Sequence, residues 1–290
     1  MNRHPHESAS WTAYLDTSEG PADPAAFADL MQHDAYPRSS AYDPAWAYRN
    51  SMGPHALWLV DALTQVLPLE PGMRVLDLGC GTAITSIFLA REHDVQVVAA
   101  DLWIEPSLNL PRIEEGGVSD RVFPVEAEAH ALPFARGYFD AIVSIDSYHY
   151  YGTDVRFLSY LAQFVKPGGA IGVMVPGNAI DPDDQPDREV ENAPYGADYS
   201  TFRSADWWAR HFRRAGGIEV TRAEMLPGGR ELWMRHERAR AAFTGRPTAE
   251  SADARFLEDY PGMGFVRLTA RRTDGDTIHF GPGRFTTRIA

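Results

Sequence analysis

The chain has 290 residues, of which 44% are hydrophobic and 23% charged, and its formal net charge at pH 7 is −13. Its length and apolar content suffice for the core of one large domain. The acidic balance argues against a nucleic acid partner, because binding along a phosphate backbone needs clustered lysine and arginine. The single cysteine excludes an internal disulfide. The sequence also has no apolar run long enough for a signal peptide or a membrane helix. The single cysteine and the missing apolar run together favour a cytoplasmic protein without membrane insertion.

The first 52 residues predict an N-terminal extension and lid. Within them, residues 36–52 mix aromatic side chains with turn residues, directly before a segment with apolar residues at helical spacing. These aromatic side chains have two interpretations. They close over a binding site, or they pack beneath the first helix of the domain.

Residues 74–82, "RVLDLGCGT", predict a short strand and a tight turn that opens a helix. Gly79 and Gly81 lack a Cβ atom where the backbone turns sharply and a ligand can lie against it. Thr82 can cap the helix that follows. A dinucleotide-binding turn would carry a third glycine and rest a pyrophosphate on the helix N-terminus, but the residue three positions after Gly81 is Ile84. The stretch therefore favours a small polar ligand over a phosphate.

Four further segments continue an alternation of strands and helices. The run "VQVVAAD" ends in Asp101, where a second parallel strand should end, and this acid can accept both hydroxyls of a ribose or cap a helix. Next come "RVFPVEAEAHALPF", a third strand running into a turn, and "FDAIVSID" at 139–146, a continuous apolar strand that ends in Asp146. In "YLAQFVKPGGAIGVMVPG" a helix closes before a fifth strand.

In this order and at this spacing, the segments resemble the motifs of class I S-adenosylmethionine (SAM) methyltransferases over about residues 50–272. The resemblance implies an α/β fold, a Rossmann-like doubly wound sheet of seven strands. Most strands should be parallel and the last antiparallel. The methyltransferase domain should span residues 53–272, with S-adenosyl-L-methionine as cofactor and S-adenosyl-L-homocysteine (SAH) as product.

The resemblance also implies the residues that bind the cofactor. In the first motif of the family, the Asp and the glycine loop hold the amino acid end of SAM. In methyltransferases of the ubiquinone-biosynthesis type, a segment acid-Ala-x-x-Leu-Pro-Phe places its acid near the adenine amino group, and here the acid is Glu rather than the commoner Asp. The expected cofactor-binding residues are Asp77, Gly79, Gly81, Thr82, Asp101, Leu102, Glu128, Ala129 and Asp146.

The second half of the domain carries two additions. Residues 177–203 form an acidic, Pro-rich connection after the fifth strand, and we expect a substrate cover loop there. A helix "SADWWARHFRRAG" capped by Ser204 and a sixth strand follow. Residues 228–260 predict inserted helices before the last strand, "FVRLTARR", which shape the substrate pocket or form a subunit contact. A homodimer is therefore compatible with the sequence. The polar tail 273–290 suggests no function.

Methyl transfer is an in-line displacement, so the protein mainly positions the acceptor and removes its proton. The loop "SIDSYHYYGTD" follows the fourth strand at the carboxyl edge of the sheet and supplies three candidate catalytic residues, His149, Tyr150 and Asp146. His149 is the first candidate for the general base, because imidazole accepts protons near neutral pH. Alternatively, His149 is a hydrogen-bonding residue of the pocket wall, and Tyr150 is a packing residue.

No metal site is expected. Asp146 could share a cation with Asn178, Asp181 and Asp183, but their spacing matches no known pattern.

The sequence thus predicts methyl transfer to a small or medium-sized acceptor that is aromatic or partly apolar. Whether the methyl group goes to oxygen, nitrogen, carbon or sulfur is left open. Two alternatives remain. One is a protein of the same fold that delivers a methylene group to a lipid, as cyclopropane synthases do, and the other is a SAM-binding sensor or scaffold without transfer activity.

Overall fold

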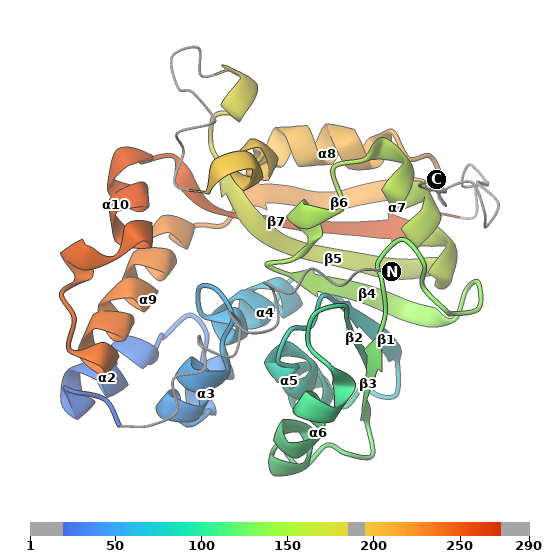
Figure 1. Cartoon of the computed structure of the whole chain (residues 1–290). Coiled ribbons are helices and arrows are strands. Elements are labelled where there is room, and N and C mark those ends of the chain that lie inside the picture. Colours follow the sequence, from blue (N-terminus) through green and yellow to red (C-terminus); the bar gives the residue numbers. More distant parts are fainter. Residues whose placement is uncertain (1–19, 185–194, 274–290) are drawn as a thin grey trace, which may run out of the picture.

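The computed structural model describes residues 20–184 and 195–273. The start of the predicted extension 1–52, the middle of the predicted cover loop 177–203 and nearly all of the tail 273–290 lie outside the described residues. The described chain is an α/β fold in which helices cover both faces of one sheet (Figure 1). This confirms the predicted fold class.

The sheet has seven strands in the order β3-β2-β1-β4-β5-β7-β6. Neighbours among the first five strands pair in parallel, and β7 is antiparallel to both β5 and β6, as predicted for the last strand. Since β1 pairs with β2 on one side and with β4 on the other, the strand order reverses at β1, and ligands of open α/β sheets bind above this point. The strands are β1 Arg74–Leu78, β2 Gln96–Asp101, β3 Val122–Glu126, β4 Phe139–Ile145, β5 Val165–Asn178, β6 Ile218–Met225 and β7 Met263–Arg272.

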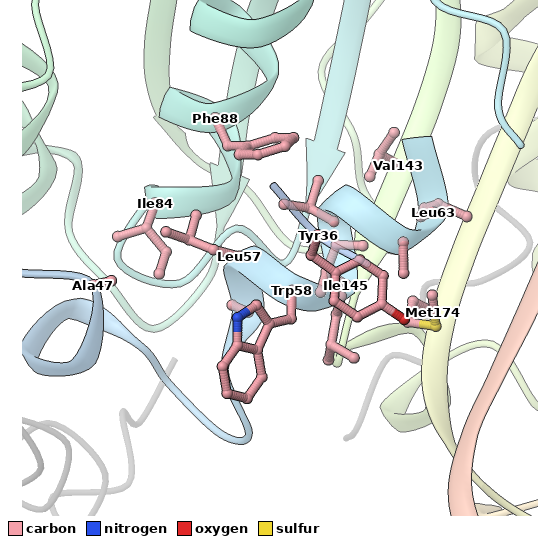
Figure 2. Close-up of a cluster of buried hydrophobic side chains, with 14 of the residues drawn as sticks. Tyr36, Ala47, Leu57, Trp58, Leu63, Ile84, Phe88, Val143, Ile145 and Met174 are labelled. Carbon is pink, nitrogen blue, oxygen red and sulfur yellow. The ribbon is translucent and has the colours of Figure 1, made fainter. Parts of the chain in front are cut away.

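Two groups of helices sandwich the sheet (Figure 1). On one face lie α4 (Ala56–Thr64), α5 (Ile84–His93) and α6 (Pro106–Glu115), and on the other lie α7 (Val155–Leu161) and α8 (Ala205–Arg213). All nine residues of α4 are buried, which suits its nearly continuous apolar sequence. Figure 2 shows side chains of α4 among residues of α5, β4 and β5, with labelled members Leu57, Leu63, Ile84, Phe88, Val143, Ile145 and Met174.

Four further helices gather beyond one end of the sheet (Figure 1). They are α2 (Pro24–Met31) and α3 (Pro44–Asn50) before the domain, and α9 (Gly229–Thr244) and α10 (Ala252–Asp259) between β6 and β7. The backbone N–H of Ala22 donates to Phe243 O at 3.0 Å, and Arg235 donates to Leu30 O at 2.8 Å. The predicted helices before the last strand are thus confirmed. The N-terminal extension packs on them and forms one helical lobe, a contact that the sequence did not indicate.

The connections contain short 3₁₀ turns. Two of them lie within residues 177–203, where the sequence suggested no regular structure. Asp181 accepts hydrogen bonds from Ser204 N at 2.8 Å and Ser204 Oγ at 3.0 Å, so this connection is tied to the start of α8. No helix in the described part of the chain is long and apolar enough to cross a membrane. The 3₁₀ turns are η1 Ser39–Ala41, η2 Tyr148–Tyr150, η3 Ala162–Phe164, η4 Pro182–Asp184, η6 Gly196–Thr201 and η7 Thr248–Glu250.

Candidate functional site

The glycine loop after β1 forms a cradle that side chains would fill. Gly79 and Gly81 have φ angles of 74° and 53°, in the left-handed region that favours glycine. A Cβ atom on Gly79 would lie 2.5 Å from Ser147 Cβ, and one on Gly81 would lie 2.9 Å from Met52 Sδ. Both positions therefore require glycine, for backbone conformation and for space.

The expectation that Thr82 caps the next helix is wrong. Helix α5 begins at Ile84, and the residue before it is Ala83, which has a φ of 64° and makes no side-chain cap. Because the loop needs this additional left-handed residue before the helix can start, Thr82 lies one position too early. Its hydroxyl instead donates to the backbone oxygen of Asn50.

Asp77 lies in β1 directly before the glycine loop and is fully buried. Its Oδ2 accepts hydrogen bonds from the hydroxyls of Thr85 and Ser86, both at 2.6 Å, whereas Oδ1 is buried and has no partner in the described chain. Burial raises the pKa of Asp77 to about 6. A buried acceptor without a donor is costly, so its oxygen fits a ligand that brings a hydrogen-bond donor, such as the ammonium group of an amino acid.

Asp101 ends β2 beside the glycine loop and organises the backbone around it. Its Oδ2 accepts from Gly81 N at 2.8 Å, and its Oδ1 accepts from Trp103 N at 2.8 Å and Ile104 N at 2.9 Å. The helix-capping interpretation is therefore wrong, because α6 begins only at Pro106 and the Asp101 carboxylate caps the turn before it. Each carboxylate oxygen has more than one acceptor position, so Asp101 can still bind ribose hydroxyls.

Glu128 and Ala129 lie in the turn after β3. The backbone N–H of Ala127 donates to Asp101 O at 2.9 Å, which places this turn beside the end of β2. The Glu128 carboxylate contacts the His130 ring at 2.7 Å and is about two-fifths exposed. Leu102 is half exposed at the same edge. The predicted adenosine-binding residues thus share one edge of the sheet with the glycine loop.

The segment between α3 and α4 lies directly on the glycine loop. Arg112 Nε of α6 donates to Asn50 Oδ1 at 2.7 Å, while Asn50 O accepts the Thr82 hydroxyl. Gly53 has a φ of 74°, and a Cβ atom there would lie closer than 3.0 Å to Asp146 Oδ2. Sequence reasoning did not assign Asn50 or Gly53 to the site, although "RNSMGP" was an available signal.

Asp146 follows β4 with a left-handed φ of 52°, unusual for a residue other than glycine. Its backbone N–H donates to Met174 O at 2.7 Å, which fixes the turn. Its carboxylate accepts no hydrogen bond from the described residues, although part of the residue surface stays accessible. Burial, and secondly the charge of Asp253, raise the pKa of Asp146 to about 8. A pKa raised this far is typical of functional residues.

Ser147 and Tyr151 join the β4 loop to β1. The Tyr151 hydroxyl donates to Leu78 O at 3.1 Å and lies 3.0 Å from Ser144 Oγ and 3.2 Å from Ser147 Oγ. Burial raises the pKa of Tyr151. These two side chains therefore hold the loop in place, a role that no local sequence pattern indicated.

The other two predicted catalytic residues lie in different surroundings. His149 is 1% exposed, its ring packs 5.5 Å from that of Phe202, and its Nδ1 has no partner within the described residues. Burial lowers the pKa of His149 to about 3. Tyr150 is 49% exposed, and its ring meets Trp103 edge-on at 5.9 Å. His149 is thus a buried packing residue of the β4 loop, whereas Tyr150 lies at the surface of the same loop.

The described residues contain no group of three His, Cys, Asp or Glu side chains arranged to hold a metal ion. Asn178 Nδ2 donates to the Tyr199 hydroxyl at 3.2 Å, and Asp183 pairs with Arg203 at 2.6 Å. These candidate ligands thus have structural partners.

A cavity of about 630 Å³ lies at the opposite edge of the sheet, where α4 and α5 end, and shares no residue with the predicted site.

Comparisons with known proteins agree with this geometry. A family described as "Methyltransferase domain" matches residues 75–169. The 27-O-demethylrifamycin SV methyltransferase of Amycolatopsis mediterranei (strain S699) is 30% identical over 240 residues, which cover 74% of this chain and 83% of that protein. The erythromycin 3''-O-methyltransferase of Saccharopolyspora erythraea is 24% identical over 74% of this chain and 77% of its own length.

The fold also matches solved structures. The geranyl diphosphate C-methyltransferase from Streptomyces coelicolor A3(2), in complex with S-adenosyl-L-homocysteine, superposes with a TM-score of 0.65. The match covers 94% of this chain and 100% of that chain at 16% identity. At this identity the likeness shows the fold alone.

Proposed function

Because the chain belongs to the class I SAM-dependent methyltransferases, we propose that it transfers a methyl group from SAM to a hydroxyl group of a small molecule. The proposal of an oxygen acceptor is supported by the names of two relatives, each matching 74% of this chain, which describe methylation at an oxygen of those proteins' substrates. The observation that carries the proposal is the position of Asp146. Its carboxylate, which accepts no hydrogen bond from the described residues, lies against Gly53 in the segment that covers the glycine loop.

The described residues fit SAM. Gly79 and Gly81 leave the loop backbone without side chains of its own, and the unpaired Oδ1 of Asp77 provides an acceptor next to it. We assign the amino acid end of the cofactor to these three residues, and the adenosine part to Asp101 and Glu128. When bound, SAM supplies a methyl group that its sulfonium has already activated.

The chain must then remove the proton of the acceptor hydroxyl. Asp146 is the better base, because its pKa of about 8 matches a proton transfer near neutral pH. His149 holds its proton weakly, since burial lowers its pKa to about 3, and no described group orients its Nδ1. We therefore assign proton removal to Asp146 and a place in the pocket wall to His149 and Tyr150.

Aromatic side chains indicate the character of the acceptor. The ring of Tyr195 packs 5.3 Å from Phe202 and 4.8 Å from Phe256, and Phe202 also contacts His149. These rings come from the connection after β5 and from the inserted helix α10. Because these rings lie beside His149 in the β4 loop, they favour an acceptor that is aromatic or partly apolar.

Mass spectrometry with trideuteromethyl-labelled SAM tests this function, with 27-O-demethylrifamycin SV and a 3''-O-demethylated erythromycin as first acceptors. We expect a product that carries all three deuterons on an oxygen atom. A product that retains only two deuterons would indicate methylene transfer instead. Calorimetric SAM binding without any labelled product would favour a sensor or scaffold and would overturn the proposal.

A further inference from the structure

Two hydrogen-bonding side chains of α6 meet at the back of the glycine loop. Asn109 is 1% exposed, and its Nδ2 donates to Gly81 O at 2.9 Å. Arg112 lies three residues later, on the same side of the helix, and its Nη1 donates to Asn109 Oδ1 at 2.9 Å. Because a guanidinium can only donate, Arg112 turns Oδ1 of Asn109 toward itself, and Nδ2 must then face the carbonyl of Gly81.

The same arginine contacts the segment that crosses the glycine loop. Its Nε donates to Asn50 Oδ1 at 2.7 Å, and the backbone oxygen of Asn50 accepts the hydroxyl of Thr82. Because Thr82 follows Gly81 in the chain, these contacts close into a ring of hydrogen bonds that joins the glycine loop, α6 and the end of α3. The ring consists of Gly81, Asn109, Arg112, Asn50 and Thr82.

Further contacts on both sides of Asn50 seat this segment on its neighbours. Trp46 Nε1 of α3 donates to Glu115 Oε2 of α6 at 2.9 Å, and Asn50 Nδ2 donates to Trp46 O at 2.9 Å. Two residues after Asn50, Met52 lies over the loop, since its Sδ would be 2.9 Å from a Cβ atom on Gly81. Asn50 is therefore the point at which the ring holds the N-terminal segment against the glycine loop.

The surroundings of Arg112 suit positioning rather than charge pairing. Its Nη1 also donates to Leu108 O at 2.8 Å. Within the described ranges no carboxylate forms an ion pair with Arg112, and its partners are amide and carbonyl oxygens. The planar guanidinium fixes the directions of its N–H groups, so one half-buried side chain sets the orientation of two asparagines at once.

We propose that Arg112 is a positioning residue for the cofactor, which acts through Asn109 and Asn50 to hold the glycine loop and the segment over it in the conformation that binds SAM and SAH. Arg112 can act in this way only if the glycine loop holds the amino acid end of SAM, so this inference rests on the proposed function. Without the ring, only a fraction of the free protein has the binding conformation, and the apparent affinity falls by that fraction.

Calorimetry with SAH tests this role without any acceptor. Arg112→Met keeps an apolar stem but loses the donors, and it should bind SAH about tenfold more weakly than wild type. Arg121→Met is the matched control, because Arg121 is also half-buried and donates to Ala90 O at 3.2 Å and to Asp94 Oδ1 at 2.8 Å. Arg121 precedes β3, at the opposite edge of the sheet. Its replacement should lower stability in chemical denaturation and leave SAH affinity unchanged.

A double-mutant cycle distinguishes positioning through the ring from a general structural role. Asn50→Ala opens the ring at its other side and should also weaken SAH binding about tenfold. When Arg112→Met is added, the ring is already open, so the loss should stay near tenfold. Two contacts that acted independently would instead multiply to a loss of about a hundredfold.

Unchanged SAH affinity in a folded Arg112→Met protein overturns the inference, and so does a multiplied loss in the double variant. If Arg112→Met does not fold, Asn50→Ala decides alone, and an affinity equal to that of wild type overturns the inference. A wild type that binds SAH but methylates nothing would refute the proposed function and leave the role of the ring intact. A wild type that does not bind SAH would refute the cofactor assignment and this inference together.

Discussion

Replacement of Gly79 by alanine tests whether the cradle after β1 holds the cofactor. The new Cβ would lie 2.5 Å from Ser147 Cβ and closer than 3.0 Å to Ser147 Oγ. Ser147 must therefore move, and its contact with the Tyr151 hydroxyl at 3.2 Å breaks. The side chain would also occupy the space above the loop.

The expected cost follows from these contacts. The left-handed φ of 74° costs about 1–2 kcal/mol for alanine, and the lost hydrogen bond adds about 1 kcal/mol. Gly79→Ala should therefore lose about 2–3 kcal/mol of unfolding free energy. Gly72→Ala is the matched control, because Gly72 has a φ of 80° and no atom within 4 Å of the new Cβ. Gly72→Ala should lose only the unfolding free energy that the left-handed φ costs alanine, about 1–2 kcal/mol.

Chemical denaturation and calorimetry with SAH separate the two effects. We expect both variants to be destabilised, whereas SAH affinity should fall at least about tenfold in Gly79→Ala alone. Adding Ser147→Gly to Gly79→Ala should recover part of the stability, because it relieves the clash. If Gly79→Ala binds SAH as tightly as Gly72→Ala does, the glycine loop is not the cofactor site.

Four further predictions follow from the same geometry. Asp101→Ala removes the acceptor of three backbone N–H groups and should weaken SAH binding by about 1–3 kcal/mol; unchanged affinity by calorimetry contradicts the assignment. The folded-state pKa of Asp146 is raised from 3.8 to about 8, so its contribution to stability is present at low pH and lost as pH rises through 8. Asp146→Asn should therefore melt above wild type at pH 9 by differential scanning calorimetry, with the difference shrinking toward pH 4, and a constant difference would refute the raised pKa. His149→Phe should retain SAH affinity and the wild-type pH–rate profile, and loss of a pH limb would restore His149 as the base. Hydrogen exchange in residues 36–52 and 195–203 should slow when SAH and acceptor bind, and equal protection with and without them would show that neither segment is a cover.

Local patterns sufficed to predict the sheet. Apolar runs that end in Asp101 and Asp146 marked buried parallel strands, and the glycines at 79 and 81 marked the turn above β1. Helix α8 begins after Ser204, as expected, and Ser204 Oγ accepts from Trp207 N at 3.1 Å. Each of these features depends on residues close together in the sequence.

Contacts between distant residues could not be predicted in this way. Arg235 of α9 and Leu30 of α2 are brought together only when the insertion folds against the N-terminal extension, and neither spacing nor periodicity encodes that hydrogen bond. The error at Thr82 has a local cause, because the left-handed conformation of Ala83 is unusual for alanine and delays the helix by one residue. The burial that lowers the pKa of His149 likewise has a long-range origin, since its ring packs against Phe202, which lies far along the chain.

The rate of methyl transfer by Asp146→Asn tests the central claim most directly, measured with trideuteromethyl-labelled SAM and an acceptor that wild type methylates. We expect a rate at least about 100-fold below that of wild type, because a general base is lost, and an unchanged SAH affinity, because the glycine loop is intact. A rate equal to that of wild type in a folded Asp146→Asn protein would contradict it.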